Sequence, residues 1–207
     1  MPDLQIHAYC GGVFQTNGYL VRLGGRAWAF DAPEGFADWL AEEGVRPEAL
    51  LLTHQHHDHI LDAGRIQEQF GCPVYAHSEP SEDLTLSKRL EQMMGIPCPI
   101  DPYTVDQLFA GLDTIDLGGF VLDLFHVPGH SPDSVCFKLR GGPVLIGGDV
   151  LFAGSIGRTD FPNGDHALLL AGIRAKLWPL PDETAVLPGH GPATTIGEEK
   201  ATNPFLA

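Results

Sequence analysis

The feature that most constrains this chain of 207 residues is a cluster of histidines directly after a short apolar run. The apolar run is Leu50 to Leu52, and residues 53–59 then read THQHHDH. On a helix His54 and His56 would point to nearly opposite sides, whereas in extended backbone residues two apart project the same way. The sequence therefore predicts a strand that ends in a loop, where His54 and His56 share one metal ion.

Two further ligand-type residues, Asp58 and His59, complete this cluster. They come where the chain turns into a predicted helix over Ile60 to Phe70, so they can bind at a neighbouring point, such as a second metal ion. An alternative is that Asp58 only caps that helix, which suits its position before the first turn. A cap does not explain the histidines beside it, so we favour a ligand role for Asp58.

Three polar residues elsewhere stand at the same kind of position, after an apolar run and a small flexible step. They are His130 after Pro128-Gly129, Asp149 after Gly147-Gly148, and His190 after Pro188-Gly189. Because loops at the carboxyl ends of strands gather in a shared crevice, we expect these residues to meet the first cluster. Seven nitrogen and oxygen ligands are about the number that two metal ions need, and zinc, iron and manganese all accept such ligands.

Glycine pairs and helix terminators predict an α/β fold with mixed sheets. Glycine tolerates the positive φ of tight turns, so Gly-Gly pairs predict three hairpins, with turns at 24–25, 118–119 and 141–142. Predicted helices that stop at Gly or Pro cover 35–43, 60–70, 81–94 and 166–177. Short strands alternate with these helices, at 50–52, 74–75 and 185–187. Two hairpin-rich regions hint at two similar halves, but no linker separates them and we predict one domain over residues 1–207.

Composition argues against several classes of function. Lys and Arg number 12 against 27 Asp and Glu, and the formal charge of −15 disfavours binding to nucleic acid or to anionic membranes. Hydrophobic residues make up 43% of the chain, and no apolar stretch approaches the ~20 residues that span a bilayer. The 4 cysteines lack a C-x-x-C spacing, so they indicate neither a disulfide scaffold nor a zinc ribbon. The first residues lack a secretory signal pattern, so we expect a cytoplasmic chain with a small molecule as its partner.

The ligand pattern resembles that of the metallo-β-lactamase superfamily. This family's pattern of T-H-x-H-x-D-H, followed by H, D and H, is matched at every ligand position. The resemblance covers essentially the whole chain and implies an αββα sandwich of two mixed β-sheets flanked by helices, with two metal ions at one edge. It also implies a ligand set, in which the first ion is held by His54, His56 and His130, the second by Asp58, His59 and His190, and Asp149 bridges the two.

A narrower resemblance is to the short bacterial members of the hydroxyacylglutathione hydrolase (glyoxalase II)-like branch. It is carried by residues 148–152 (GDVLF), 155–161 (SIGRTDF) and 203–205 (NPF). In longer glyoxalase II enzymes a basic residue at the place of Arg158 helps to hold glutathione. The resemblance therefore implies that Arg158 binds substrate, and a guanidinium can pair with a carboxylate through two hydrogen bonds. The alternative is a surface arginine that is paired with Asp160.

The site predicts a metal-dependent hydrolase. We expect two divalent metal ions per chain, most simply zinc, with iron or manganese as alternatives. The two ions would share a water molecule and lower its pKa from about 15.7 toward about 7. The resulting hydroxide would attack a carbonyl carbon, and Asp58 would orient it. These motifs hold no uncommitted acid to protonate a poor leaving group, whereas a thiolate needs little protonation. Small thioesters of the S-lactoylglutathione type therefore suit the site.

Other functions stay open on the same residues. Persulfide dioxygenases look similar here, and their single iron could be held by His54, His130 and Asp149. Lactonase or other ester hydrolysis and a metal-binding module without catalysis are further alternatives. Metal stoichiometry separates the hydrolase from the dioxygenase. We expect His57 to face solvent or the rim of the site. The sequence does not decide whether residues 81–102 form a lid over the pocket.

Overall fold

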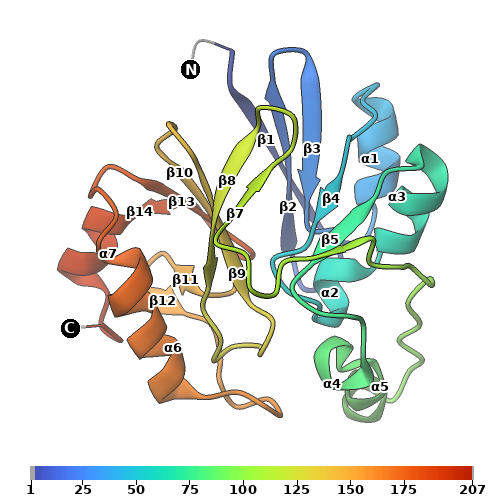
Figure 1. Cartoon of the computed structure of the whole chain (residues 1–207). Helices are drawn as coiled ribbons and strands as arrows, with labels where there is room; N and C mark the ends of the chain where they lie inside the picture. The colour runs from blue at the N-terminus through green and yellow to red at the C-terminus, as the bar shows by residue number, and fades with distance from the viewer. Residues whose placement is uncertain (1–2, 207) are drawn as a thin grey trace. The chain divides into compact units, whose positions relative to one another are not determined.

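The computed structural model describes residues 3–206, and these divide into two compact units. We call residues 3–109 the N-terminal unit and residues 110–206 the C-terminal unit. Each unit has a six-stranded sheet with helices packed on it (Figure 1). Within the described residues, no helix is both long enough and apolar enough to cross a membrane.

The sheet of the N-terminal unit has the strand order β1-β2-β3-β4-β5-β6. Its first three strands pair antiparallel and its last three add in parallel, so the sheet is mixed. The strands are β1 (Gln5–Gly11), β2 (Thr16–Leu23), β3 (Arg26–Phe30), β4 (Leu50–Leu51), β5 (Val74–Ala76) and β6 (Gln107–Leu108). The helices are α1 (Phe36–Glu42), α2 (His57–Ile60), α3 (Ala63–Phe70), α4 (Glu82–Thr85) and α5 (Ser87–Met94).

Helices α1 and α3 cover one face of this sheet, where β3, β4 and β5 run side by side (Figure 1). The covering side chains include Phe36 and Leu40 of α1 and Ile66 of α3, which share one buried cluster with Leu50 and Val74 of the strands. Burial of this apolar surface stabilises the sheet by roughly 25 cal/mol for each Å² removed from water. The packing holds the end of β4 in a fixed position.

The sheet of the C-terminal unit has the order β14-β13-β10-β9-β8-β7 and is also mixed, because only β10 and β13 pair in parallel. Its strands are β7 (Thr114–Asp116), β8 (Val121–His126), β9 (Val135–Leu139), β10 (Val144–Gly148), β13 (Ala185–Pro188) and β14 (Thr194–Thr195). A separate hairpin is formed by β11 (Leu151–Phe152) and β12 (Ser155–Ile156). The helices are α6 (His166–Gly172), the π-helical turn η1 (Ile173–Leu177) and α7 (Ile196–Thr202).

The C-terminal unit has a core of its own beneath these helices. Leu169 of α6, Ile173 of η1 and Ile196 of α7 pack with Leu145 and Val186 of the central strands. The Gly118-Gly119 turn between β7 and β8 has φ values of 71° and 96°. Side chains other than glycine rarely adopt such values, so this pair allows the hairpin that the sequence predicts.

The predicted class, two mixed sheets with flanking helices, is confirmed, but two helices differ from their predicted bounds. The helix expected over 60–70 starts at His57 and breaks after Ile60, because the chain bends at residues 61–62 before α3. The helix expected over 81–94 is interrupted at Leu86, whose φ is 57°. The prediction of a single domain over residues 1–207 stays a prediction.

Candidate metal centre

Four predicted ligands of the N-terminal unit lie together at the end of β4. The chain leaves the strand after Leu51 and turns into the short helix α2, so His54, His56, Asp58 and His59 come from one loop and its first helical turn. The His54 ring lies 4.6 Å from the His56 ring and 4.1 Å from the His59 ring, between centroids. The Asp58 Oδ2 atom is 3.6 Å from His59 Nε2. We call these four residues the N-terminal half-site.

A buried carboxylate, Asp31, supports this half-site from the end of β3. Its Oδ1 accepts a hydrogen bond from the Thr53 amide at 2.7 Å, and its Oδ2 accepts one from the Thr53 hydroxyl at 2.8 Å. The same Oδ2 lies 2.8 Å from His59 Nδ1. Asp31 has a φ of 55° and is 1% exposed. Hydrogen bonds of this kind fix the orientation of the rings that a metal ion needs.

The Asp58 carboxylate is held by a residue from another strand. The hydroxyl of Thr16, at the start of β2, donates a hydrogen bond to Asp58 Oδ2 at 2.6 Å. The contact fixes one carboxylate oxygen, and the Thr16 side chain that makes it is itself buried. The N-cap residue of α2 is His56, and Asp58 lies inside the first turn of that helix, past the cap position. The capping alternative for Asp58 is therefore wrong.

The three predicted ligands of the C-terminal unit also lie together, and each lies in the loop that follows a strand. His130 follows β8, Asp149 follows β10 and His190 follows β13. The Asp149 Oδ2 atom lies 3.5 Å from His130 Nε2 and 3.4 Å from His190 Nε2. Two ligands of one tetrahedral zinc ion lie about 3.4 Å apart, because each bond is about 2.1 Å long. We call these three residues the C-terminal half-site.

The loop after β12 closes on this half-site. His130 Nδ1 lies 2.8 Å from the backbone carbonyl oxygen of Arg158. At Gly157 a Cβ atom would come within 1.9 Å of the Asp149 carbonyl oxygen and 3.1 Å of His130 Cβ. Only glycine therefore permits this close approach, which places the Arg158 carbonyl beside the His130 ring.

The hydrogen bonds of three histidines fit the residues for metal binding. His130 Nδ1 faces a carbonyl oxygen and His59 Nδ1 faces a carboxylate, so both must donate a proton there. His54 Nδ1 lies 3.1 Å from Thr53 Oγ1, whose own proton goes to Asp31, so it donates as well. In the neutral form of each ring the Nε2 atom is then the unprotonated one and can act as a metal ligand. All seven predicted ligands belong to groups of His and Asp side chains that could hold a metal ion.

Arg158 is predicted to bind substrate, and its side chain is exposed. The guanidinium forms two hydrogen bonds with the Asp160 carboxylate, at 2.7 and 2.8 Å, and lies 4.0 Å from the Phe161 ring centroid. This is the pairing with Asp160 that the alternative describes. The hydrogen bonds that Arg158 donates to Asp160 also raise the pKa of Arg158, so the guanidinium stays charged. A role of Arg158 in substrate binding stays a prediction.

His57 differs from its prediction in one respect. It is buried, with 6% exposure, and so does not face solvent. Its Nε2 atom lies 3.1 Å from the backbone carbonyl oxygen of Cys98, and it lines a pocket that also contains Asp58. The expectation that His57 lies at the rim of the site is therefore the one that fits.

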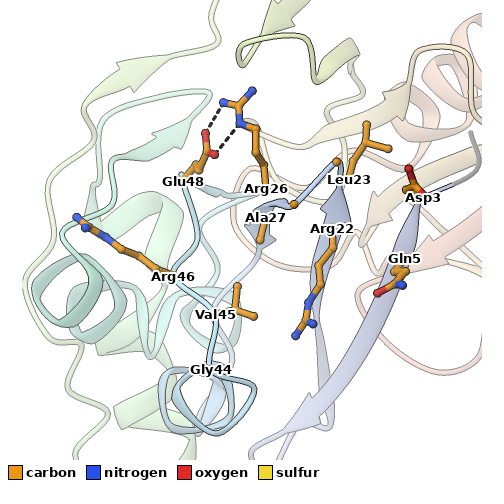
Figure 2. A pocket seen from close by; sticks show the side chains of 12 residues that line it. Asp3, Gln5, Arg22, Leu23, Arg26, Ala27, Gly44, Val45, Arg46 and Glu48 are labelled. Atoms are coloured by element: carbon orange, nitrogen blue, oxygen red, sulfur yellow. Dashed lines mark hydrogen bonds and ion pairs between the residues drawn. The ribbon is translucent and has the colours of Figure 1, made fainter.

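A pocket of about 540 Å³ elsewhere in the N-terminal unit contains none of the predicted site residues. Figure 2 shows Arg26 paired with Glu48 at this pocket, and Arg46 and Arg22 among its other lining residues. Arg26 pairs with Glu48, Arg22 pairs with Glu43 at 2.6 Å, and the Arg46 Nε atom donates to the Phe70 carbonyl oxygen. These arginines are held by local partners, so the pocket adds nothing to the metal centre.

Residues 11–190 match the family described as the metallo-beta-lactamase superfamily, and this range includes both half-sites. The chain belongs to the metallo-beta-lactamase superfamily. It is a metallo-hydrolase of this superfamily, with histidine and aspartate side chains suited to divalent metal ions. The membership confirms the family predicted from the ligand pattern.

Relatives narrow the place of the chain within the metallo-beta-lactamase superfamily. Hydroxyacylglutathione hydrolase GloC of Haemophilus influenzae is 38% identical over 194 residues, which cover 93% of this chain and 88% of that protein. This relative supports the glyoxalase II-like branch. The crystal structure of the BLEG-1 B3 metallo-beta-lactamase has a TM-score of 0.90 at 40% identity, over 98% of this chain and 100% of that one. The crystal structure of TTHA1623 in a di-iron-bound form has a TM-score of 0.82 at 36% identity, over 97% of this chain and 100% of that one.

The pattern of ligands does not single out three residues that the site uses. Asp31, Thr16 and Gly157 hold the ligands without belonging to the ligand set. Asp31 carries the one available signal, since it directly follows a buried strand, as the predicted ligands do. Thr16 and Gly157 act through contacts between segments far apart in the sequence, which no local pattern encodes.

Proposed function

We propose that the chain is a binuclear metallohydrolase that cleaves small thioesters of the S-lactoylglutathione type. The observation that carries this proposal is the hydrogen bonding of His54, His59 and His130, which leaves the ligand nitrogen of each ring unprotonated. Rings held this way suit metal binding better than the fully solvated histidines of a surface loop. The di-iron form of TTHA1623 supports two ions for a related fold.

The proposal brings the two half-sites together around two metal ions. His54, His56 and His130 would hold the first, and Asp58, His59 and His190 the second, with Asp149 between them. We expect zinc, with iron or manganese as alternatives. When bound, such ions polarise a carbonyl oxygen and lower the pKa of a water molecule. The cytoplasmic location of the protein also stays a prediction.

Asp58 is the residue that we propose to act in catalysis. Its Oδ2 atom accepts the Thr16 hydrogen bond, which fixes the plane of the carboxylate. A carboxylate held in this way can orient an attacking water molecule and accept its proton. The other carboxylate of the half-sites, Asp149, lies next to His130 and His190 as a proposed ligand, so it is not free to protonate a leaving group. A leaving group that departs as an anion, such as a thiolate, therefore suits these residues better than an amine.

The choice of a glutathione thioester rests on the GloC relative and on Arg158. GloC is named a hydroxyacylglutathione hydrolase. The exposed Arg158 guanidinium already holds a carboxylate through two hydrogen bonds, so a substrate carboxylate could replace Asp160 there. Arg158→Lys would remove the paired geometry and keep the charge, and we expect it to raise KM more than it lowers kcat.

The test is the hydrolysis of S-lactoylglutathione by protein loaded with zinc, iron or manganese in turn. We expect turnover with at least one metal and loss of at least 10²-fold in kcat for Asp58→Asn. Asp38→Asn is the control, because Asp38 lies in the same unit, is exposed and pairs with Arg65 outside the ligand set. Absence of turnover with all three metals would reject the thioester. One iron per chain with oxygen uptake on glutathione persulfide would support the dioxygenase instead.

A further inference from the structure

A pocket of about 400 Å³ lies beside the catalytic carboxylate, entirely within the N-terminal unit. It is lined by Asp58 and Thr16, by the β1–β2 loop and by the segment after α5. A volume of this order is at the lower end of the range that small-molecule sites occupy. Asp58 therefore borders both the half-site and a space large enough for part of a substrate.

The wall of this pocket is made by exposed apolar side chains. Val13 is 78% exposed, Phe14 40%, Met94 42% and Ile96 54%, and all four line the pocket. Only nine large hydrophobic side chains are exposed among residues 3–206, so nearly half of them gather here. A concentrated apolar surface in a concave place indicates a binding site for an apolar group.

Four carboxylates line the pocket, those of Glu34, Asp58, Asp62 and Asp101. They have no Lys or Arg among the other lining residues, although Arg65 lies 3.4 Å from Asp62 outside the lining. An anionic group would meet repulsion there and lose its hydration without a cationic partner. An uncharged apolar group avoids both costs.

Hydrogen bonds keep the two walls in place. The Cys98 carbonyl oxygen lies 3.1 Å from His57 Nε2, and the Cys98 amide donates to Glu91 Oε1 at 3.1 Å. In the β1–β2 loop the Gln15 amide donates to the Gly12 carbonyl oxygen at 3.1 Å. A pocket whose walls are already connected binds a ligand with a smaller loss of conformational freedom.

We propose that this pocket receives the acyl chain of the substrate, and that the enzyme prefers thioesters of uncharged, apolar acyl groups longer than lactoyl. The inference rests on the proposed function, because Asp58 borders the pocket and acts on the thioester carbonyl. According to this inference the acyl group of the substrate determines specificity, because the acyl group is attached to the carbonyl that is attacked. A lactoyl group offers only one methyl group to the apolar wall, whereas a longer acyl chain offers several methylene groups.

The experiment compares glutathione thioesters that differ only in the acyl group: propanoyl, hexanoyl and succinyl. Burial of each methylene group raises kcat/KM about 3-fold, so hexanoyl should exceed propanoyl by about 30-fold. The succinyl thioester should fall below propanoyl, because its carboxylate meets the acidic lining. The Kd of S-hexylglutathione and S-propylglutathione, measured by calorimetry, provides the same comparison without turnover.

Two variants locate the effect in the pocket. Phe14→Ser should reduce the ratio of kcat/KM for the hexanoyl thioester to that for the propanoyl thioester at least 3-fold. Phe205→Ser is its matched control, because Phe205 is 48% exposed and does not line the pocket. Ile96→Arg should raise the succinyl rate relative to propanoyl, because it places a cation among the carboxylates.

The results distinguish this inference from the proposed function. Equal kcat/KM for propanoyl and hexanoyl thioesters, with S-lactoylglutathione still hydrolysed, would overturn the pocket assignment alone. Equal Kd values for the two alkyl glutathiones would overturn it even if no thioester turned over. Absence of turnover with a 10-fold or greater difference in Kd would overturn the hydrolase and support the pocket.

Discussion

Asp31 is the residue on which the order of the N-terminal half-site depends most. Its two oxygens take three hydrogen bonds, two from Thr53 and one from His59, in a place closed to water. The Thr53 hydroxyl donates its proton to the same carboxylate, so its oxygen accepts a hydrogen bond from His54 Nδ1. A single buried carboxylate therefore orients two ligand rings.

We predict that Asp31→Asn lowers metal affinity by about 10- to 100-fold, because the amide cannot accept all three hydrogen bonds. Metal titration with a competing chelator measures this loss. Asp38→Asn is the control, since Asp38 is an exposed partner of Arg65 in the same unit. Unchanged metal affinity in Asp31→Asn would show that the carboxylate does not orient the ligands.

The cysteines provide a second prediction at this scale, based on burial. Burial raises the pKa of the Cys72 thiol to about 11 and that of Cys136 to about 12, whereas Cys10 is exposed. A thiol reacts as its thiolate, and at pH 8 these two buried thiols stay protonated. We expect iodoacetamide to label Cys10 and to spare Cys72 and Cys136, as read by peptide mass spectrometry. Rapid labelling of Cys136 in the folded protein would contradict this.

At the residue scale the sequence predicts the metal ligands better than the residues that hydrogen-bond to those ligands. His54 and His56 follow from the alternation of an extended chain, and the structure places both rings together. His130, Asp149 and His190 follow from their position after strands, and they do meet within one unit. Thr16 could not be predicted, because its bond to Asp58 spans 42 positions. That the seven residues form one centre stays a prediction.

At the scale of elements, turns were easier to predict than helix continuity. Hairpins at glycine pairs are encoded locally by the positive φ that glycine allows. The interruption of one predicted helix at Leu86 is not encoded in this way, because leucine seldom adopts the φ of 57° found there. Tertiary packing of the buried Leu84 and Leu86 side chains accompanies that conformation. The helix α7 was not predicted, although its Thr195 cap bonds the Glu198 amide.

The hairpin of β11 and β12 supplies the prediction at this scale. Gly157→Ala would force a Cβ atom against the Asp149 carbonyl oxygen, so the loop that carries Arg158 must move away from His130. We expect loss of bound metal and at least a 10-fold fall in kcat, measured by metal analysis and a thioester assay.

Gly154→Ala is the control for this change. Gly154 lies in the same hairpin with a φ of 67° and open space for a Cβ atom, so the variant should lose about 1 kcal/mol of stability and keep its metal. Full activity in Gly157→Ala would show that the close approach at Gly157 is not needed.

For the whole molecule, the resemblance of the two hairpin-rich regions corresponds to two units with six-stranded sheets and separate cores. The sequence could indicate this from the repeated order of hairpin, strand and polar loop. It could not indicate where one unit ends, because the boundary between Phe109 and Ala110 is not marked by a Pro-rich or Ser-rich linker. The boundary depends on which strands pair, a non-local property.

We predict that removal of metal destabilises the chain, because a metal ion that binds only the folded state stabilises that state. A metal at 1,000 times its Kd stabilises the folded state by about 4 kcal/mol. For a chain of this size that corresponds to a fall in Tm of about 10 °C after chelation, as calorimetry would show. A Tm that does not change on chelation and reloading would contradict stabilisation by bound metal.

The central proposal is that the seven predicted ligands bind two metal ions. Its most direct test is the metal content per chain, determined by mass spectrometry of the metals after loading and desalting. We predict two ions per chain in the native protein, with at most one retained in either His56→Ala or His190→Ala. One ion or none in the native protein, or two in both variants, would contradict the claim.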